Sequence, residues 1–113
     1  SQVINWSHNN RIVRFRLPIG VSYNEDPEIV KKLLLEVADE NPNVQKEPKP
    51  KVFFDNFGDS SLDFRLGIWT STYTDKPEFL KSEIYFAIFK KFRENNIQIP
   101  YPQRDVHIKT QVK

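Results

Sequence analysis

Two histidines are the residues of this chain best suited to proton transfer or metal binding, and they lie far apart in the sequence. His8 stands near the N-terminus, and His107 lies between Val106 and Ile108 near the C-terminus. Zinc sites use several His, Cys, Asp or Glu ligands at short, regular spacings, and the sequence has no such pattern. We therefore interpret His107 as a solvated or interface residue, and we predict neither a metal site nor a catalytic histidine.

Three aspartates at four-residue intervals, Asp55, Asp59 and Asp63, are the second candidate for chemistry. Acid–base catalysis needs groups that are held within hydrogen-bond reach of one proton. Strand alternation and an intervening turn would scatter these carboxylates, so we interpret them as turn and surface residues. Three glycines spread over the chain cannot form a phosphate-binding loop. The sequence thus predicts a protein that is not an enzyme and has no cofactor.

Arg14, Arg16 and Arg65 suggest a third chemistry, the binding of RNA on one face of a sheet. RNA-recognition sheets carry aromatic residues on the open face, within a motif such as K/R-G-F/Y-G/A-F-V-x-F/Y. The corresponding segment reads SLDFRLGI, so Asp63 and Arg65 would lie on the open face while Phe64 points into the core. A solvated or intersubunit face is the simpler interpretation, and RNA binding remains an alternative.

A small ligand-binding domain of the same topology is a further alternative. Such domains usually have a glycine at the turn between the first strand and the first helix. This chain has Tyr23-Asn24-Glu25-Asp26 at that turn.

The composition of the 113 residues fits one globular domain. Hydrophobic residues make up 38%, with nine Phe and two Trp, which is enough for a core. The net charge of +2 is too small to indicate a nucleic-acid or membrane partner. The absence of cysteine excludes disulfides and thiol chemistry, and no apolar run reaches the roughly 18 residues of a spanning helix. The abrupt, strand-like start at Val3, Ile4 and Trp6 lacks signal-peptide features, so we expect a piece of a longer protein.

A long strand is predicted from Arg11 to Tyr23, because apolar and polar side chains alternate along it. Pro18 cannot donate a hydrogen bond to a neighbouring strand, so we expect the strand to bend or to change partners there. The predicted buried side of the strand consists of Val13, Phe15, Leu17, Ile19 and Val21.

Two helices and a hairpin are predicted after this strand. Asp26, as N-cap, and Pro27, at the first helical position, open the first helix. Segments 51–57 and 62–70 form the hairpin, and the second helix begins near Pro77. The stripe of the first helix is Ile29, Val30, Leu33, Leu34, Val37 and Ala38; that of the second is Leu80, Ile84, Ala87, Ile88 and Phe92.

A short segment, 97–99, is expected to add a last strand. The order strand, helix, strand, strand, helix, strand predicts an α+β fold, a ferredoxin-like split βαβ sandwich. We expect one core to contain Ile29, Leu33, Val37, Leu66, Ile68, Ile84 and Ile88.

The last 15 residues, IPYPQRDVHIKTQVK, do not fit that sandwich. Pro100 and Pro102 interrupt whatever precedes them. Val106, Ile108 and Val112 then fall on one side of a predicted strand that has no sequential neighbour to pair with. We therefore expect an appended C-terminal strand.

Four stretches resemble the cytoplasmic C-terminal region of the small-conductance mechanosensitive channel family (MscS-type channels). They occur in the family's order and span nearly the whole chain. They are INWS (Ile4–Ser7), IGVSYNEDPE (Ile19–Glu28), ENPNVQKEPKPKVFFDNFGDSSLDFRLGIW (Glu40–Trp69) and IPYPQRDVHI (Ile99–Ile108).

The resemblance implies a homoheptamer whose soluble parts form a hollow cage at the cytoplasmic face of a prokaryotic inner membrane. The membrane would be reached through a pore region outside this sequence. The strand after the PYPQ hinge would join those of the other subunits in a parallel barrel, which abolishes the exposed edges. Arg16 would lie near the side portals of the cage. The implied interface residues are Pro102, Gln103, Asp105, Val106, Ile108 and Val112.

The resemblance also implies a division of the chain. Residues 1–17 would end a preceding β domain, residues 18–100 would form the ferredoxin-like cage domain, and residues 101–113 would be hinge and barrel strand. The expected function is the cage domain of a membrane-tension-gated ion channel that responds to osmotic stress, contributing subunit assembly and solute filtering. A ferredoxin-like RNA- or ligand-binding interaction domain is the alternative.

Overall fold

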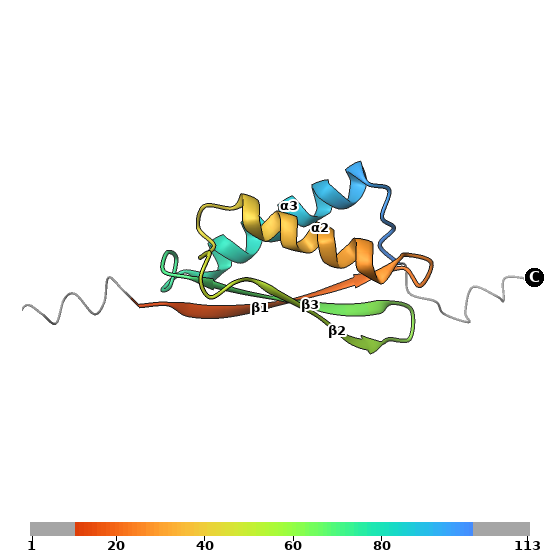
Figure 1. Ribbon diagram of the computed structural model, residues 1–113, viewed down its shortest axis with the longest axis horizontal. Helices are drawn as coiled ribbons and strands as arrows, with labels where there is room; N and C mark the ends of the chain where they lie inside the picture. Colours follow the sequence, from red (N-terminus) through yellow and green to blue (C-terminus); the bar gives the residue numbers. More distant parts are fainter. Residues whose placement is uncertain (1–10, 101–113) are drawn as a thin grey trace, which may run out of the picture.

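The computed structural model describes residues 11–100, which form a three-stranded antiparallel sheet with two helices on one of its faces (Figure 1). The order of strands across the sheet is β1-β3-β2, so β3 is central and β1 and β2 are the edges. This arrangement confirms the predicted α+β class. The elements are β1 (Val13–Val21), α2 (Pro27–Glu40), β2 (Lys51–Phe57), β3 (Leu62–Thr70) and α3 (Pro77–Glu94).

Strand β1 alternates between buried and exposed side chains as predicted, but it does not change partners at Pro18. It pairs with β3 over its whole length, from Val13 opposite Thr70 to Val21 opposite Leu62. Of the two expected alternatives, a bend or a change of partner, the change of partner is therefore wrong. A proline is tolerated here because β1 is an edge strand, where a missing N–H breaks no ladder. The division of the chain at residue 17 stays a prediction.

The hairpin of β2 and β3 has the predicted bounds. Val52 pairs with Leu66 and Phe54 with Phe64, and the register then shifts between Phe54 and Asn56, which leaves Asp55 in a bulge. Gly58 begins the turn, and a Cβ there would lie 2.6 Å from Asp63 Oδ2. Only glycine fits this turn without a shift of its neighbours.

Helix α2 begins as predicted. The Asp26 carboxylate accepts a hydrogen bond from the Glu28 amide at 2.9 Å, and Pro27 occupies the first turn. Ile29 is an exception to the predicted stripe, because its side chain is 48% exposed. At about 100° per residue, Ile29 lies beyond Leu33 at the border of the stripe, so its predicted core position is wrong.

One apolar core lies between the sheet and the helices. It contains the other six residues predicted to share it. The buried hydrophobic residues are Phe15, Leu17, Ile19, Val21, Val30, Leu33, Leu34, Val37, Ala38, Val44, Leu62, Phe64, Leu66, Ile68, Leu80, Ile84, Ile88 and Phe92.

Segment 97–99 is not a strand, and that prediction is wrong. The Ser22 amide donates to Gln98 O at 2.9 Å, which places the segment beside the end of β1. The amides of the segment itself are used elsewhere, because Ile97 N donates to Phe92 O and Gln98 N donates to a Glu25 carboxylate oxygen. Segment 97–99 is therefore joined to the end of β1 by the one backbone hydrogen bond from Ser22 to Gln98, and it does not form the ladder of a fourth strand.

Candidate functional site

Of the predicted site residues, only Arg16 lies within residues 11–100. Arg16 is exposed on β1, on the face of the sheet that points away from the helices. His8 and His107 lie outside the described residues. So do the predicted interface residues, which are Pro102, Gln103, Asp105, Val106, Ile108 and Val112.

The face of the sheet opposite the helices is called the open face here, and it is basic and aromatic. Arg16 and Lys51 flank Gly67 in one row across the three strands. Among the described residues neither has a carboxylate within 4 Å. Its basic and aromatic members are Arg14, Arg16, Lys51, Phe53, Arg65 and Trp69, and Pro18, Asn56 and Asp63 lie on the same face.

Both aromatic rings of the open face are covered by guanidinium groups. Arg14 Cζ lies 6.0 Å from the centre of the Trp69 ring, and Arg65 Cζ lies 4.6 Å from that of Phe53. Arg65 also donates through Nε and Nη2 to the two oxygens of Asp55, at 3.1 and 3.2 Å. Nucleic-acid platforms offer aromatic faces on which bases stack, and these two rings are already occupied.

The three aspartates at four-residue intervals have separate surroundings, as predicted. Asp55 pairs with Arg65, while Asp63 accepts hydrogen bonds from Ser61 Oγ at 2.6 Å and Asn56 Nδ2 at 3.3 Å. Asp59 is exposed in the turn. Over residues 11–100 no group of three or more His, Asp or Glu side chains is placed to hold a metal ion.

Glu83 on α3 is the centre of a polar cluster that joins two loops to the helices. It accepts from Asn41 Nδ2 at 3.3 Å, Asn43 Nδ2 at 3.2 Å and the Tyr73 hydroxyl at 3.2 Å. The hydrogen bond to Glu83, with its negative charge, raises the pKa of Tyr73. A tyrosine held in its neutral form by a carboxylate is suited to fixing a loop, not to transferring protons.

Lys91 connects the two helices. Its Nζ lies 3.0 Å from Glu40 Oε2 and 3.5 Å from Glu36 Oε1. The hydrogen bond to Glu40 is the main cause that raises the pKa of Lys91, with Glu36 adding to it. These contacts fix α2 against α3 from the solvent side.

The free edge of β2 exposes two phenylalanines on its helix-facing side, and we call them the β2 patch: Phe54 and Phe57. These residues are 41% and 71% exposed. Phe54 stacks on the buried Phe64 with 4.8 Å between ring centres, and Phe57 packs edge-on against Phe54 at 5.1 Å. The patch is thus held in place by the core.

Helix α3 exposes a second set of aromatic rings, and we call it the α3 stripe: Phe79, Phe86 and Phe89. Their exposed fractions are 51%, 76% and 49%. Lys76 Nζ lies 5.8 Å from the Phe79 ring centre, and Arg93 Cζ lies 5.6 Å from that of Phe89. A cation therefore borders the stripe at each end.

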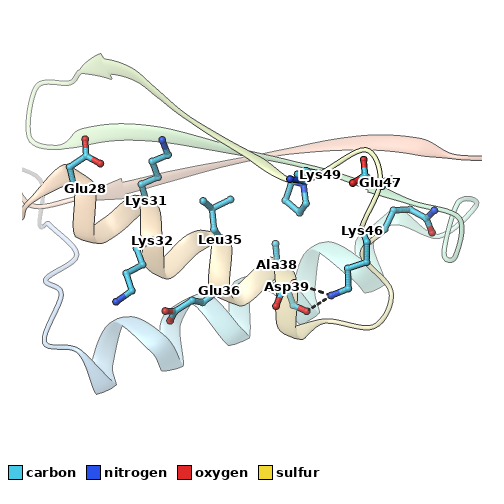
Figure 2. Close-up of a pocket in the computed structure, with 12 residues that line it drawn as sticks. Glu28, Lys31, Lys32, Leu35, Glu36, Ala38, Asp39, Lys46, Glu47 and Lys49 are labelled. Atoms are coloured by element: carbon cyan, nitrogen blue, oxygen red, sulfur yellow. Dashed lines mark hydrogen bonds and ion pairs between the residues drawn. The ribbon is translucent and has the colours of Figure 1, made fainter.

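An open groove of about 760 Å³ lies between α2 and the loop before β2 (Figure 2). Leu35, Ala38 and Pro50 contribute its apolar lining. Lys46 Nζ closes one end by pairing with Asp39 at 3.0 Å. Four acidic and four basic residues line the groove, so it has no charge preference: Glu28, Lys31, Lys32, Glu36, Asp39, Lys46, Glu47 and Lys49.

The exposed aromatic residues are what the sequence reasoning missed. The nine Phe residues were counted toward the core, but only Phe15, Phe64 and Phe92 are buried. Two signals were present in the sequence. Adjacent Phe53 and Phe54 must point to opposite faces of a strand, and the α3 stripe lies off the apolar stripe that begins at Leu80.

None of the helices within residues 11–100 is long and apolar enough to cross a membrane.

Comparison with known proteins gives a consistent result. Residues 15–99 match the family described as "Mechanosensitive ion channel MscS, C-terminal". An uncharacterised MscS family protein of Haemophilus influenzae is 37% identical over 108 residues, which is 96% of this chain and 10% of that protein. The mechanosensitive channel MscK of Escherichia coli is 37% identical over 107 residues, or 95% of this chain and 10% of that protein. The chain therefore spans about a tenth of the length of these two relatives.

The fold has a matching solved structure. The crystal structure of Helicobacter pylori MscS in its closed state superimposes with a TM-score of 0.77 and 29% identity. The match covers 86% of this chain and 38% of that one. Sequence and structure thus point to the same group of proteins.

Proposed function

This chain belongs to the MscS family of mechanosensitive channels, and from that membership we propose that it is the cytoplasmic cage domain of a membrane-tension-gated ion channel. The observation that carries the proposal is the match of residues 15–99 to the family's C-terminal domain. The parent protein would be an integral protein of a prokaryotic inner membrane. This domain would lie on the cytoplasmic side, without catalysis or a cofactor.

The proposed partner of the domain is a further copy of itself, in a heptamer. Support comes from the C-terminal sequence, where Val106, Ile108 and Val112 recur on one side of a predicted strand. A single strand with an apolar face is an aggregation hazard, and closing several copies into a barrel removes the exposed edges. Pro102, Gln103 and Asp105 would position that strand.

Solute filtering is the second proposed contribution, and Arg16 is the candidate portal residue. Arg16 and Lys51 place two cations in one row of the open face, on either side of Gly67. Cations along a water-filled passage attract anions and repel cations. The open face would therefore favour the passage of anions wherever it borders the cage openings.

The test of the proposed assembly uses the double variant Val106→Asp with Ile108→Asp. We expect it to reduce the heptamer fraction of the detergent-solubilised channel, as seen by native mass spectrometry. The melting temperature of the isolated 113-residue chain should remain unchanged, because the proposed contacts lie between subunits. The matched control, His107→Asp with Gln111→Asp, adds the same number of carboxylates on the other side of the predicted strand and should leave the heptamer intact.

Two results would contradict the proposal. A double variant that unfolds the isolated chain would make residues 104–113 part of the domain's own core. A full-length protein that remains monomeric in detergent without any substitution would exclude a self-assembling cage.

A further inference from the structure

The β2 patch and the α3 stripe lie on opposite flanks of the domain. Helix α2 contacts β2 and β3, whereas α3 reaches the other edge of the sheet, where the Tyr85 hydroxyl donates to Pro18 O at 2.9 Å. Figure 1 shows both helices on the same face of the sheet. The β2 patch is therefore on the α2 side, and α3 covers the β1 side.

The contacts of α3 fix the direction in which its stripe points. Lys91 faces α2 through its two glutamates, Leu80 and Ile84 face the core, and Tyr85 faces β1. At about 100° per residue, Phe79, Phe86 and Phe89 occupy the remaining side of the helix. The stripe thus points away from both the sheet and α2.

We propose that the β2 patch of one subunit packs against the α3 stripe of the next, as a head-to-tail contact between copies of this chain. A two-fold dimer would join one patch to itself, whereas two different patches on opposite flanks fit a heterologous contact. Such a contact closes into a ring when the rotation between successive copies is a whole fraction of a turn. Exposed aromatic residues on an edge strand are a liability unless another chain covers them. The inference rests on the proposed homo-oligomer and specifies which surfaces meet.

The areas agree with a contact that forms only within an assembly. A phenylalanine side chain offers roughly 200 Å², so the exposed fractions leave about 220 Å² of ring surface on the β2 patch and about 350 Å² on the α3 stripe. The two patches together would bury about 500–600 Å² of aromatic surface, less than the roughly 1,200 Å² of a stable complex. The isolated chain should therefore associate weakly, and copies joined by other parts of the channel should associate well.

Cysteine crosslinking in the full-length channel tests this contact. This chain contains no cysteine, and any cysteine elsewhere in the protein would be replaced by serine. Asn56 lies beside the β2 patch and Ser82 lies within the α3 stripe, and both are exposed. With a short bismaleimide, the double variant Asn56→Cys with Ser82→Cys should give a ladder of multimers up to the complete ring. Each single variant should give no dimer.

The aromatic character of the contact is tested by adding Phe86→Ser to the double-cysteine variant. Phe86 is 76% exposed, so its loss should leave the melting temperature unchanged while lowering the crosslinking rate about tenfold. Lys81→Ser, an exposed position on α3 outside the stripe, is the matched control and should have no effect.

The other outcomes overturn the inference in distinguishable ways. Dimers from either single variant would show a two-fold contact. The absence of a ladder from a channel that still assembles would overturn the head-to-tail contact and leave the proposed function standing. A channel that does not assemble at all would overturn both.

Discussion

Replacing Leu66 by alanine is expected to lower the free energy of unfolding by about 3–4.5 kcal/mol. Leu66 lies in the middle of the central strand, opposite Leu17 on one side and Val52 on the other, and it is 0% exposed. The substitution removes three carbon groups, which at roughly 0.8 kcal/mol each amounts to about 2.4 kcal/mol. A residual cavity of about 40–80 Å³ adds about 1–2 kcal/mol, at roughly 24 cal/mol per Å³.

Urea unfolding of the 113-residue chain, followed by circular dichroism, measures this loss. The slope of the free energy with urea should stay unchanged, so that the midpoint alone reports stability. In a thermal melt the variant should lose at least about 12 °C, at roughly 4–8 °C per kcal/mol.

Ile29→Ala is the matched control, because it removes a similar side chain that the sequence also predicted to be buried. Since Ile29 is 48% exposed, its loss should cost about 1 kcal/mol or less. The packing described above would be refuted if Leu66→Ala cost under about 1 kcal/mol, or if Ile29→Ala cost as much as Leu66→Ala.

Three further results are expected. Asp26→Ala should cost about 1 kcal/mol in urea melts, since its carboxylate caps α2; an unchanged midpoint would contradict the cap. The pKa of Lys91 is raised in the folded state, so its ion pairs contribute their full stabilisation of the fold at pH values below 10.5, the pKa of the unfolded state. This stabilisation is lost as the pH rises through the higher pKa of the folded state. The free energy of unfolding of Lys91→Met should therefore fall less at alkaline pH than that of the unchanged chain. If the two curves of free energy against pH run parallel, the contact does not contribute. Fluorescence anisotropy at physiological salt should show no micromolar, sequence-selective RNA binding to the open face, and any weak binding should fall steeply with salt; a selective complex would favour RNA recognition.

The local elements could be predicted from the sequence because short-range chemistry determines them. The bounds of the hairpin follow from strand alternation, and the start of α2 follows from Asp26 and Pro27. The burial of Leu66 and Ile68 follows from the same alternation.

Features that depend on packing between elements could not be predicted. The exposure of Ile29 depends on how α2 is rotated against the sheet, which the apolar stripe leaves uncertain at its borders. The tolerance of Pro18 depends on β1 being an edge strand, a property of the whole sheet. Segment 97–99 has strand-like residues, but its amides have nearer acceptors in Phe92 and Glu25.

The candidate surfaces show the same limit. A phenylalanine has the same hydrophobicity whether it fills a core or an interface. The phenylalanines of the β2 patch and the α3 stripe could therefore be distinguished from core phenylalanines only by their exposure in the structure. Arg65 illustrates the point for charge. Strand alternation predicts that Arg65 lies on the open face. It does not predict that Arg65 pairs with Asp55 or lies over the Phe53 ring.

The central claim is that this domain belongs to a channel gated by membrane tension, and patch-clamp recording tests it most directly. The full-length protein that carries the domain would be purified and reconstituted into liposomes, so that no other channel is present. Suction applied to an excised patch should open stepwise currents that close when the suction is released. Patches that contain the protein but show no current up to the tension that ruptures the membrane would contradict the claim.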